Sequence, residues 1–193
     1  MRVSVIIPTI EIRKEMLKET LESVKNQTVQ PCEILILREK VTAISGKLNR
    51  GIEKSIGDAF IILCDDDKLD PTYIEKTVKK MEETKADIVG TALENFGEYT
   101  GIHQFNQVPF VTSLVKKSIW EKVGGYDEAI KVGEDADFYT MCINNGAKIE
   151  KISEPLLKYR CHSLGKGERH WEEPNRLRKE KYRRLNYGYD PYN

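Results

Sequence analysis

Short apolar runs alternate along the chain with segments in which apolar residues recur every three or four positions. The runs are typical of buried strands, and the periodic segments are typical of helices that bury one face. The alternation therefore predicts an α/β domain built around one layered sheet, without an internal repeat. The predicted strands are Val3–Ile7, Ile34–Leu37, Ala59–Cys64, Ile88–Leu93, Phe110–Val115, Ile149–Ile152 and Leu156–Tyr159.

The segments between these strands predict the helices. The first helix is expected to end near Asn26. Apolar residues at helical spacing from Ile74 to Met81 predict another helix further along the chain. Asp70 and Pro71 are expected to begin this later helix, with aspartate as the capping residue and proline in the first turn. The other predicted helices are Ile44–Ile56, a short helix that reaches Gly124, and Asp135–Asn145.

Length and charge limit the organisation of the chain. The 193 residues suit one domain with a sizeable core. Lys plus Arg equal Asp plus Glu at 31 each, which gives no reason to expect a nucleic-acid partner. We predict a folded domain at 1–165 and a basic, aromatic-rich tail at 166–193. The tail fits a solvated helix packed on the domain or, as the alternative, peripheral contact with an anionic membrane surface.

The location of the protein and the state of its thiols follow from two further patterns. No apolar run approaches the ~18 residues that cross a bilayer, and the first apolar run is too short for a signal peptide. We therefore expect a cytoplasmic protein. The four cysteines show no C-x-x-C spacing, which favours buried thiols over a zinc site.

Three consecutive aspartates, Asp65, Asp66 and Asp67, follow the apolar run Phe60–Leu63. They thus stand at the carboxyl end of a predicted strand, where open α/β sheets bind ligands. Adjacent carboxylates repel one another unless a cation compensates, so a divalent metal that holds a diphosphate fits them. A solvated turn that caps the next helix is the alternative, and the presence of Asp70 makes that role unnecessary.

A second acidic cluster and a late histidine are weaker candidates. Glu134 and Asp135 begin a predicted helix, where the helix dipole alone favours acids, but a carboxylate there also suits a general base. His162 follows the last predicted strand, and a lone histidine is more often structural than a ligand. Ser45-Gly46-Lys47 is no phosphate loop, because Val41 stands where that motif requires glycine.

Taken in order, several segments resemble the inverting family 2 glycosyltransferases of the GT-A fold. The resemblance extends from about Val3 to His162. It rests on the ordered set rather than on any one motif. The segments are Val3–Thr9, Asn26–Thr28, Glu33–Leu37, Lys47–Gly51, Ile62–Asp67 followed by Pro71, and Val123–Glu128 followed by Gly133–Asp135.

The resemblance implies a single-domain GT-A fold, with a mixed, mostly parallel sheet flanked by helices, and a role for each matching residue. Asp135 would be the general base, with Glu134 beside it. The metal, Mn²⁺ or Mg²⁺, would be held by Asp65, Asp66, Asp67 and His162. The nucleotide-sugar donor would be contacted by Pro8, Thr9, Glu11, Glu39, Lys47, Asn49, Asp65 and Asp66.

The implied function is metal-dependent, inverting transfer of a sugar from a nucleotide-sugar donor to a hydroxyl on a glycan, lipid or protein. The Gln-x-x-Arg-Trp motif of processive members is absent, which predicts one sugar per encounter. The polar stretch Glu94–Val108 is expected to be a loop that closes over the donor.

The sequence differs from the family pattern at two places, and two alternative functions remain to be considered. Arg38 and then Glu39 follow the second strand where the family has aspartate, and Cys64 replaces the first acid of a D-x-D-D pattern. A nucleotidyltransferase would usually carry a glycine-rich loop, which Ile7–Ile10 lacks. A degenerate binding module would have lost an acidic cluster, and both are present.

Overall fold

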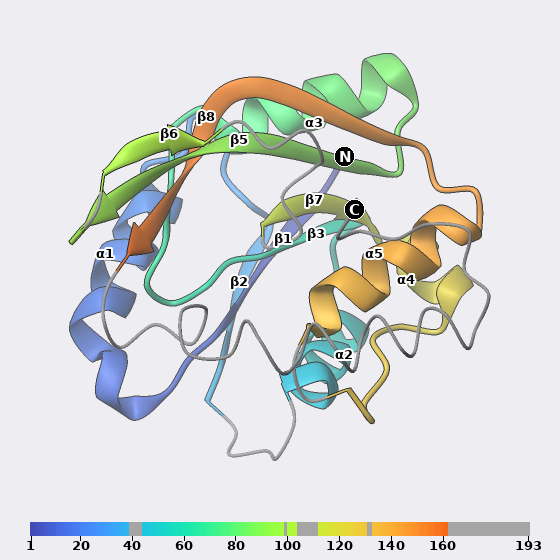
Figure 1. Cartoon of the computed structure of the whole chain (residues 1–193), viewed down its shortest axis with the longest axis horizontal. Coiled ribbons are helices and arrows are strands. Elements are labelled where there is room, and N and C mark those ends of the chain that lie inside the picture. The colour runs from blue at the N-terminus through green and yellow to red at the C-terminus, as the bar shows by residue number, and fades with distance from the viewer. Residues whose placement is uncertain (39–43, 99, 104–111, 131–132, 162–193) are drawn as a thin grey trace.

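The computed structural model describes residues 1–38, 44–98, 100–103, 112–130 and 133–161, and the following concerns these residues (Figure 1). The helices are α1 (Lys14–Lys25), which follows the 3-10 turn η1 (Glu11–Arg13), α2 (Ile44–Lys54), α3 (Tyr73–Thr84), α4 (Lys117–Val123) and α5 (Glu134–Asn144). The strands are β1 (Val3–Pro8), β2 (Glu33–Leu37), β3 (Ala59–Ile62), β4 (Lys68–Leu69), β5 (Ile88–Gly97), β6 (Gly101–His103), β7 (Ser113–Lys116) and β8 (Ile149–Cys161).

The strands form one mixed sheet in the order β2-β1-β3-β7-β5-β8-β4, with β6 paired to β5. β1 pairs in parallel with β2 and β3, and β5 pairs in parallel with β8 along most of its length. β7 joins the two parallel groups by pairing antiparallel to both β3 and β5. This arrangement confirms the predicted α/β class and its mixed sheet.

Helices cover both faces of the sheet, so the central strands are apolar on both sides. In β1, Val5 and Ile7 face the layer that contains α1 and α3, whereas Ile6 faces α2, α4 and α5. All three side chains are fully buried. Figure 1 shows α1 on one side of the strands and α2, α4 and α5 grouped on the other. The sandwich leaves the strand ends, rather than the faces, free to form a site.

The stretch Glu94–Val108 was predicted as a loop, and for its first part that is wrong. β5 continues to Gly97, and β6 pairs with it in register from Leu93 opposite His103. These residues are polar because the end of β5 extends past the core, where its side chains are partly exposed. Residues 99 and 104–111 lie outside the described part of the chain.

One strand replaces the two predicted for the end of the domain. β8 runs unbroken through the polar segment Ser153–Pro155, where its register against β5 shifts between Thr91 and Leu93. A bulge at this point accommodates the proline, which cannot donate to the ladder. The two-residue strand β4 has too little sequence to show a period.

Asp70 does not cap α3, contrary to the prediction. The helix begins at Tyr73, and its flanking Thr72 makes no side-chain capping bond. Asp70 Oδ1 instead accepts hydrogen bonds from Thr72 N at 2.9 Å and Thr72 Oγ1 at 2.7 Å. The aspartate therefore shapes the turn that precedes the helix.

Candidate active site

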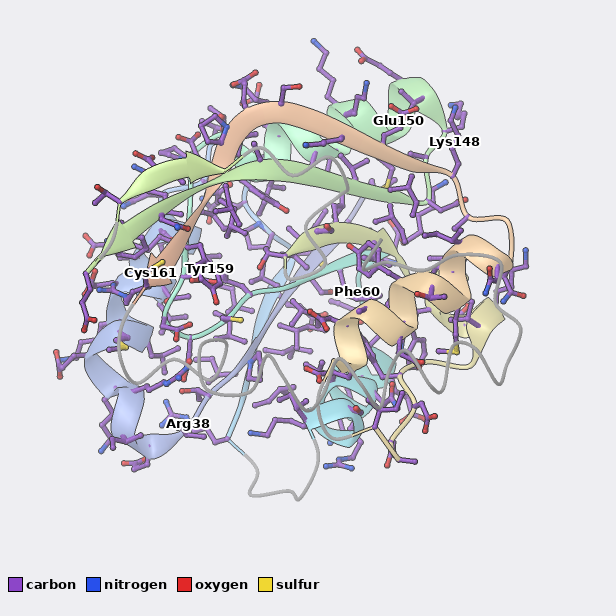
Figure 2. The ribbon with its side chains drawn as sticks, viewed as in Figure 1. Arg38, Phe60, Lys148, Glu150, Tyr159 and Cys161 are labelled. Atoms are coloured by element: carbon purple, nitrogen blue, oxygen red, sulfur yellow. The ribbon has the colours of Figure 1, made fainter. Side chains whose placement is uncertain are left out.

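The predicted residues that the structure describes follow strands that end at one edge of the sheet. β1, β2 and β3 are parallel, so the residues that follow them lie at a common edge. β5 and β8 run in the same direction as β3 because β7 is antiparallel to both β3 and β5. Figure 2 shows Arg38, Tyr159 and Cys161 toward this end of the sheet and Lys148 with Glu150 at the opposite end.

Asp65 ties the loop after β3 to the loop after β1. Its Oδ2 accepts hydrogen bonds from Thr9 Oγ1 at 2.7 Å and from Ile10 N at 3.4 Å. Its Oδ1 accepts from Arg13 Nη1 at 2.8 Å. Both carboxylate oxygens are thus engaged with protein donors, and the residue is buried. Its visible role is to fix the geometry of the two loops.

Arg13 lies between two of the three aspartates. The same Nη1 atom that contacts Asp65 is 2.8 Å from Asp66 Oδ2. Burial alone would lower the pKa of Arg13, but the hydrogen bond to Asp65 and the charge of Asp66 outweigh it and raise that pKa. Arg13 thereby offsets part of the negative charge of the cluster.

Asp67 lies deepest in the cluster, with 1% of its surface exposed. Its Oδ1 accepts a hydrogen bond from Arg160 N at 2.9 Å. Its Oδ2 is buried and has no hydrogen-bond partner among the described residues. Burial, followed by the charge of Asp66, raises the pKa of Asp67 to about 8. A buried oxygen of this kind lacks a compensating cation.

Cys64 completes a group that can hold such a cation. One ligand atom from each of Cys64, Asp66 and Asp67 lies within 4.8 Å of the other two. Burial and then the three aspartates raise the pKa of the Cys64 thiol well above its usual value. The residues fit a divalent ion, because it would partner Asp67 Oδ2 and reduce the repulsion. Asp65, predicted as a ligand, lies outside this group.

The prediction of four buried thiols is wrong for Cys32. Cys142 is buried, but Cys32 is exposed, and Cys64 and Cys161 are partly exposed. Cys64 follows the end of β3 and Cys161 ends β8, so both lie at the edge that carries the aspartates. Apolar flanking residues cannot distinguish a thiol inside a strand from one just past its end.

Arg160 connects the loop that carries the three aspartates to α1. Its Nε donates to Asp66 O at 2.9 Å, and its Nη2 donates to Glu19 Oε2 at 2.8 Å. Its guanidinium lies 4.4 Å from the centre of the Phe96 ring. Sequence reasoning did not single out Arg160 or Arg13, because charged residues in a late strand and in a first helical turn are usually solvent-facing.

Lys47 joins the ends of the first two strands. Its side chain is buried, and Nζ donates to Thr9 O and Leu37 O, each at 3.3 Å. The cation is thus held at the edge where the donor contacts were predicted. Pro8 is half-buried beside it, whereas Glu11 is exposed and paired with Lys14.

Asn49 holds the segment that precedes α5. Its Nδ2 donates to Tyr126 O at 2.9 Å and to Glu128 Oε1 at 3.2 Å, and its Oδ1 accepts from Tyr126 N at 2.8 Å. Gly125 has φ +81° there, and a Cβ on it would lie 2.8 Å from Asn49 Oδ1. The contact of Asn49 with the donor stays a prediction.

Asp135 lies in the first turn of α5, as predicted, with Glu134 immediately before it. Gly133 precedes the helix at φ 78°, and Asp135 is half-buried. Tyr126 stacks on Phe138 of the same helix at 4.4 Å between ring centroids. α5 leads to the amino end of β8, so its own start lies at the site edge.

Two predicted residues, Glu39 and His162, lie outside the described residues, as does the tail at 166–193. Among the described residues, no helix has the length and apolar character needed to span a membrane.

Sequence comparison connects the chain to a known family. The sequence model described as Glycosyl transferase family 2 matches residues 35–142. The uncharacterized glycosyltransferase MJ1057 of Methanocaldococcus jannaschii is 26% identical over 82% of this chain and 70% of its own length. The uncharacterized glycosyltransferase YwdF of Bacillus subtilis is 24% identical over 72% of this chain and 67% of its own length.

Solved structures share the fold. The S. aureus TarS 1-349 complex with UDP-GlcNAc superposes with a TM-score of 0.76 at 15% identity over 98% of this chain and 68% of that one. The corresponding UDP complex gives 0.70 at 15% identity, and there the match covers 83% of this chain and 61% of TarS 1-349. These likenesses confirm the predicted GT-A fold class. Since the family match covers more than half of its length, the chain belongs to glycosyl transferase family 2, a family of enzymes.

Proposed function

We propose that the protein transfers a sugar from a nucleotide-sugar donor to an acceptor hydroxyl, with a divalent cation in the site and with inversion at the anomeric carbon. The observation that carries this proposal is the cluster at the end of β3. Asp66 and Asp67 lie there beside the β1 loop, and Asp67 Oδ2 is buried without a partner. A cation bound there would offset the negative charge that develops on the departing diphosphate.

The chain's own groups would hold the donor. Lys47 Nζ donates to Thr9 O and Leu37 O, so a positive charge is fixed at the sheet edge where β1 and β2 end. Thr9 is fixed in turn by its bond to Asp65. A rigid loop that carries few mobile groups favours one orientation of the donor, because little side-chain freedom is lost on binding. UDP and UDP-GlcNAc are bound by TarS, which makes uridine nucleotides the first donors to test.

Asp135 would accept the proton of the attacking hydroxyl. A half-buried carboxylate at the start of α5, at the same sheet edge, suits this role. The proton would pass to Asp135 as the acceptor oxygen bonds to the anomeric carbon and the bond to the diphosphate breaks. Attack from the face opposite the leaving group gives inversion in one step.

A donor screen with a stereochemical readout tests the proposal. Nucleotide sugars are incubated with the full chain, Mn²⁺ or Mg²⁺ and simple acceptor alcohols, and proton NMR follows the first product formed. We expect one donor class to be consumed and its α-linked sugar to appear in β linkage. Retained configuration would refute single displacement, and release of pyrophosphate would indicate nucleotidyl transfer instead.

A further inference from the structure

The acidic cluster contains a cysteine at a position where the family pattern has an acidic residue. Cys64 occupies the first acidic position of the D-x-D-D pattern. Asp67 N donates to Cys64 O at 3.2 Å, which closes a tight turn over these four residues. The turn brings Cys64 Sγ together with one oxygen each of Asp66 and Asp67, all within 4.8 Å of one another.

Few oxygens in this turn are available to a cation. Asp65 uses both of its oxygens on Thr9, Ile10 and Arg13. Asp66 Oδ2 contacts Arg13, and Asp67 Oδ1 accepts from Arg160 N. Asp67 Oδ2 is the buried oxygen of this turn without a partner, and the residue is 1% exposed. A cation that entered here would find a thiol as its third protein donor.

We propose that Cys64 is a metal ligand, so that the site takes thiophilic divalent cations such as Co²⁺ and Zn²⁺ more tightly than Mg²⁺. Thiolate is a soft ligand that favours these ions, whereas carboxylates alone suit Mg²⁺. The thiol releases its proton to solvent as the bond from sulfur to the metal forms. This inference rests on the proposed function and adds the class of metal.

Titration with Co²⁺ tests the thiol directly, because cobalt bound to thiolate has a charge-transfer absorption that cobalt bound to oxygen lacks. The full chain is titrated under reducing conditions, alongside C64S, C64D and the matched control C32S. We expect the band in wild type and C32S and its loss in C64S. Co²⁺ affinity should fall about tenfold or more in C64S, with a smaller change for Mg²⁺. C64D restores the acid and should shift the preference toward Mg²⁺.

The outcomes separate this inference from the proposed function. If wild type binds Mn²⁺ and nucleoside diphosphate but shows no charge-transfer band, and C64S binds Co²⁺ equally well, the thiol is not a ligand while the function stands. If neither protein binds any divalent ion, the metal dependence fails as well. Circular dichroism of C64S and C64D checks that both fold, and C64D supplies a test if C64S does not.

Discussion

Asp67 links the charge of the site to the stability of the fold. Its pKa is raised to about 8, with burial as the main cause. In the unfolded chain the carboxyl titrates near 3.8, so the metal-free folded state binds an extra proton between these values. Stability from this group is therefore full below about pH 4 and is lost as the pH rises to about 8.

The variant Asp67→Asn should remove this pH dependence. In EDTA, we expect the melting temperature of wild type minus that of Asp67→Asn to fall steadily from pH 4 to pH 8. The difference between the two proteins cancels the other titrating groups, which they share. A difference that stays constant over this range would contradict the raised pKa.

Asp135 should matter for transfer more than for donor binding. Asp135→Asn preserves the size and the polar character of the first turn of α5 but removes the base. We expect nucleotide affinity close to wild type and a fall of about 10²-fold or more in transfer. Asp137→Asn, in the same turn, is the matched control: a loss of stability alone should lower the melting temperature without a selective loss of transfer. Loss of nucleotide binding in Asp135→Asn would place that residue in the donor site instead.

The sequence indicated the acidic cluster that follows β3 but not the hydrogen-bond and ion-pair partners of each aspartate. Asp65, Asp66 and Asp67 were recognised from their place after an apolar strand. Their separate partners come from Arg13 and Arg160, which are distant in sequence and carry no local signal. Cys64 was noted only as a departure from a pattern. Long-range contacts of this kind are set by the sheet topology.

At the scale of elements, the turn between α4 and α5 depends on a close approach between Gly125 and Asn49. Gly124 and Gly125 both have φ +81°, but only Gly125 would bring a Cβ into contact, 2.8 Å from Asn49 Oδ1. Gly124→Ala therefore has strained backbone alone, whereas Gly125→Ala has strain and a clash. The two variants form a matched pair.

We expect Gly125→Ala to destabilise the protein more than Gly124→Ala. The backbone term costs about 1–3 kcal/mol in each, and the clash adds to it only in Gly125→Ala. Chemical denaturation of both variants measures the difference in free energy of unfolding. Equal losses would mean that Asn49 moves aside without cost and does not hold this segment.

The sequence predicted the strands and helices well where they pack in the core, and poorly where β5 and β8 are partly exposed. β1 and β3 are apolar on both faces, and α1 and α3 have clear apolar stripes. β5 and β8 extend past the core and past the predicted strands, where Phe96 and Arg160 lie opposite each other. Their strand conformation is fixed by that pairing, so hydrophobic periodicity could not reveal it.

For the whole molecule, the site edge joins parts of the chain that are far apart in sequence. The bond from Thr9 to Asp65 joins the loops after β1 and β3, Lys47 joins α2 to the end of β2, and Arg160 joins β8 to α1. A ligand bound across this edge should therefore stabilise the entire domain. UDP with Mn²⁺ at one hundred times its Kd should add about 2.7 kcal/mol, seen as a raised melting temperature. UDP with EDTA should add much less, and an equal rise in both would argue against a metal at the diphosphate.

The most direct test of the account is the release of nucleoside diphosphate from the active donor, measured for wild type and Asp66→Asn with Mn²⁺ and with EDTA. The account predicts turnover only for wild type with metal, a fall of orders of magnitude in Asp66→Asn, and a folded variant by circular dichroism. Asp58→Asn, an exposed aspartate paired with Arg2 away from the site edge, serves as the control and should keep its activity. Full turnover by Asp66→Asn in EDTA would contradict the account.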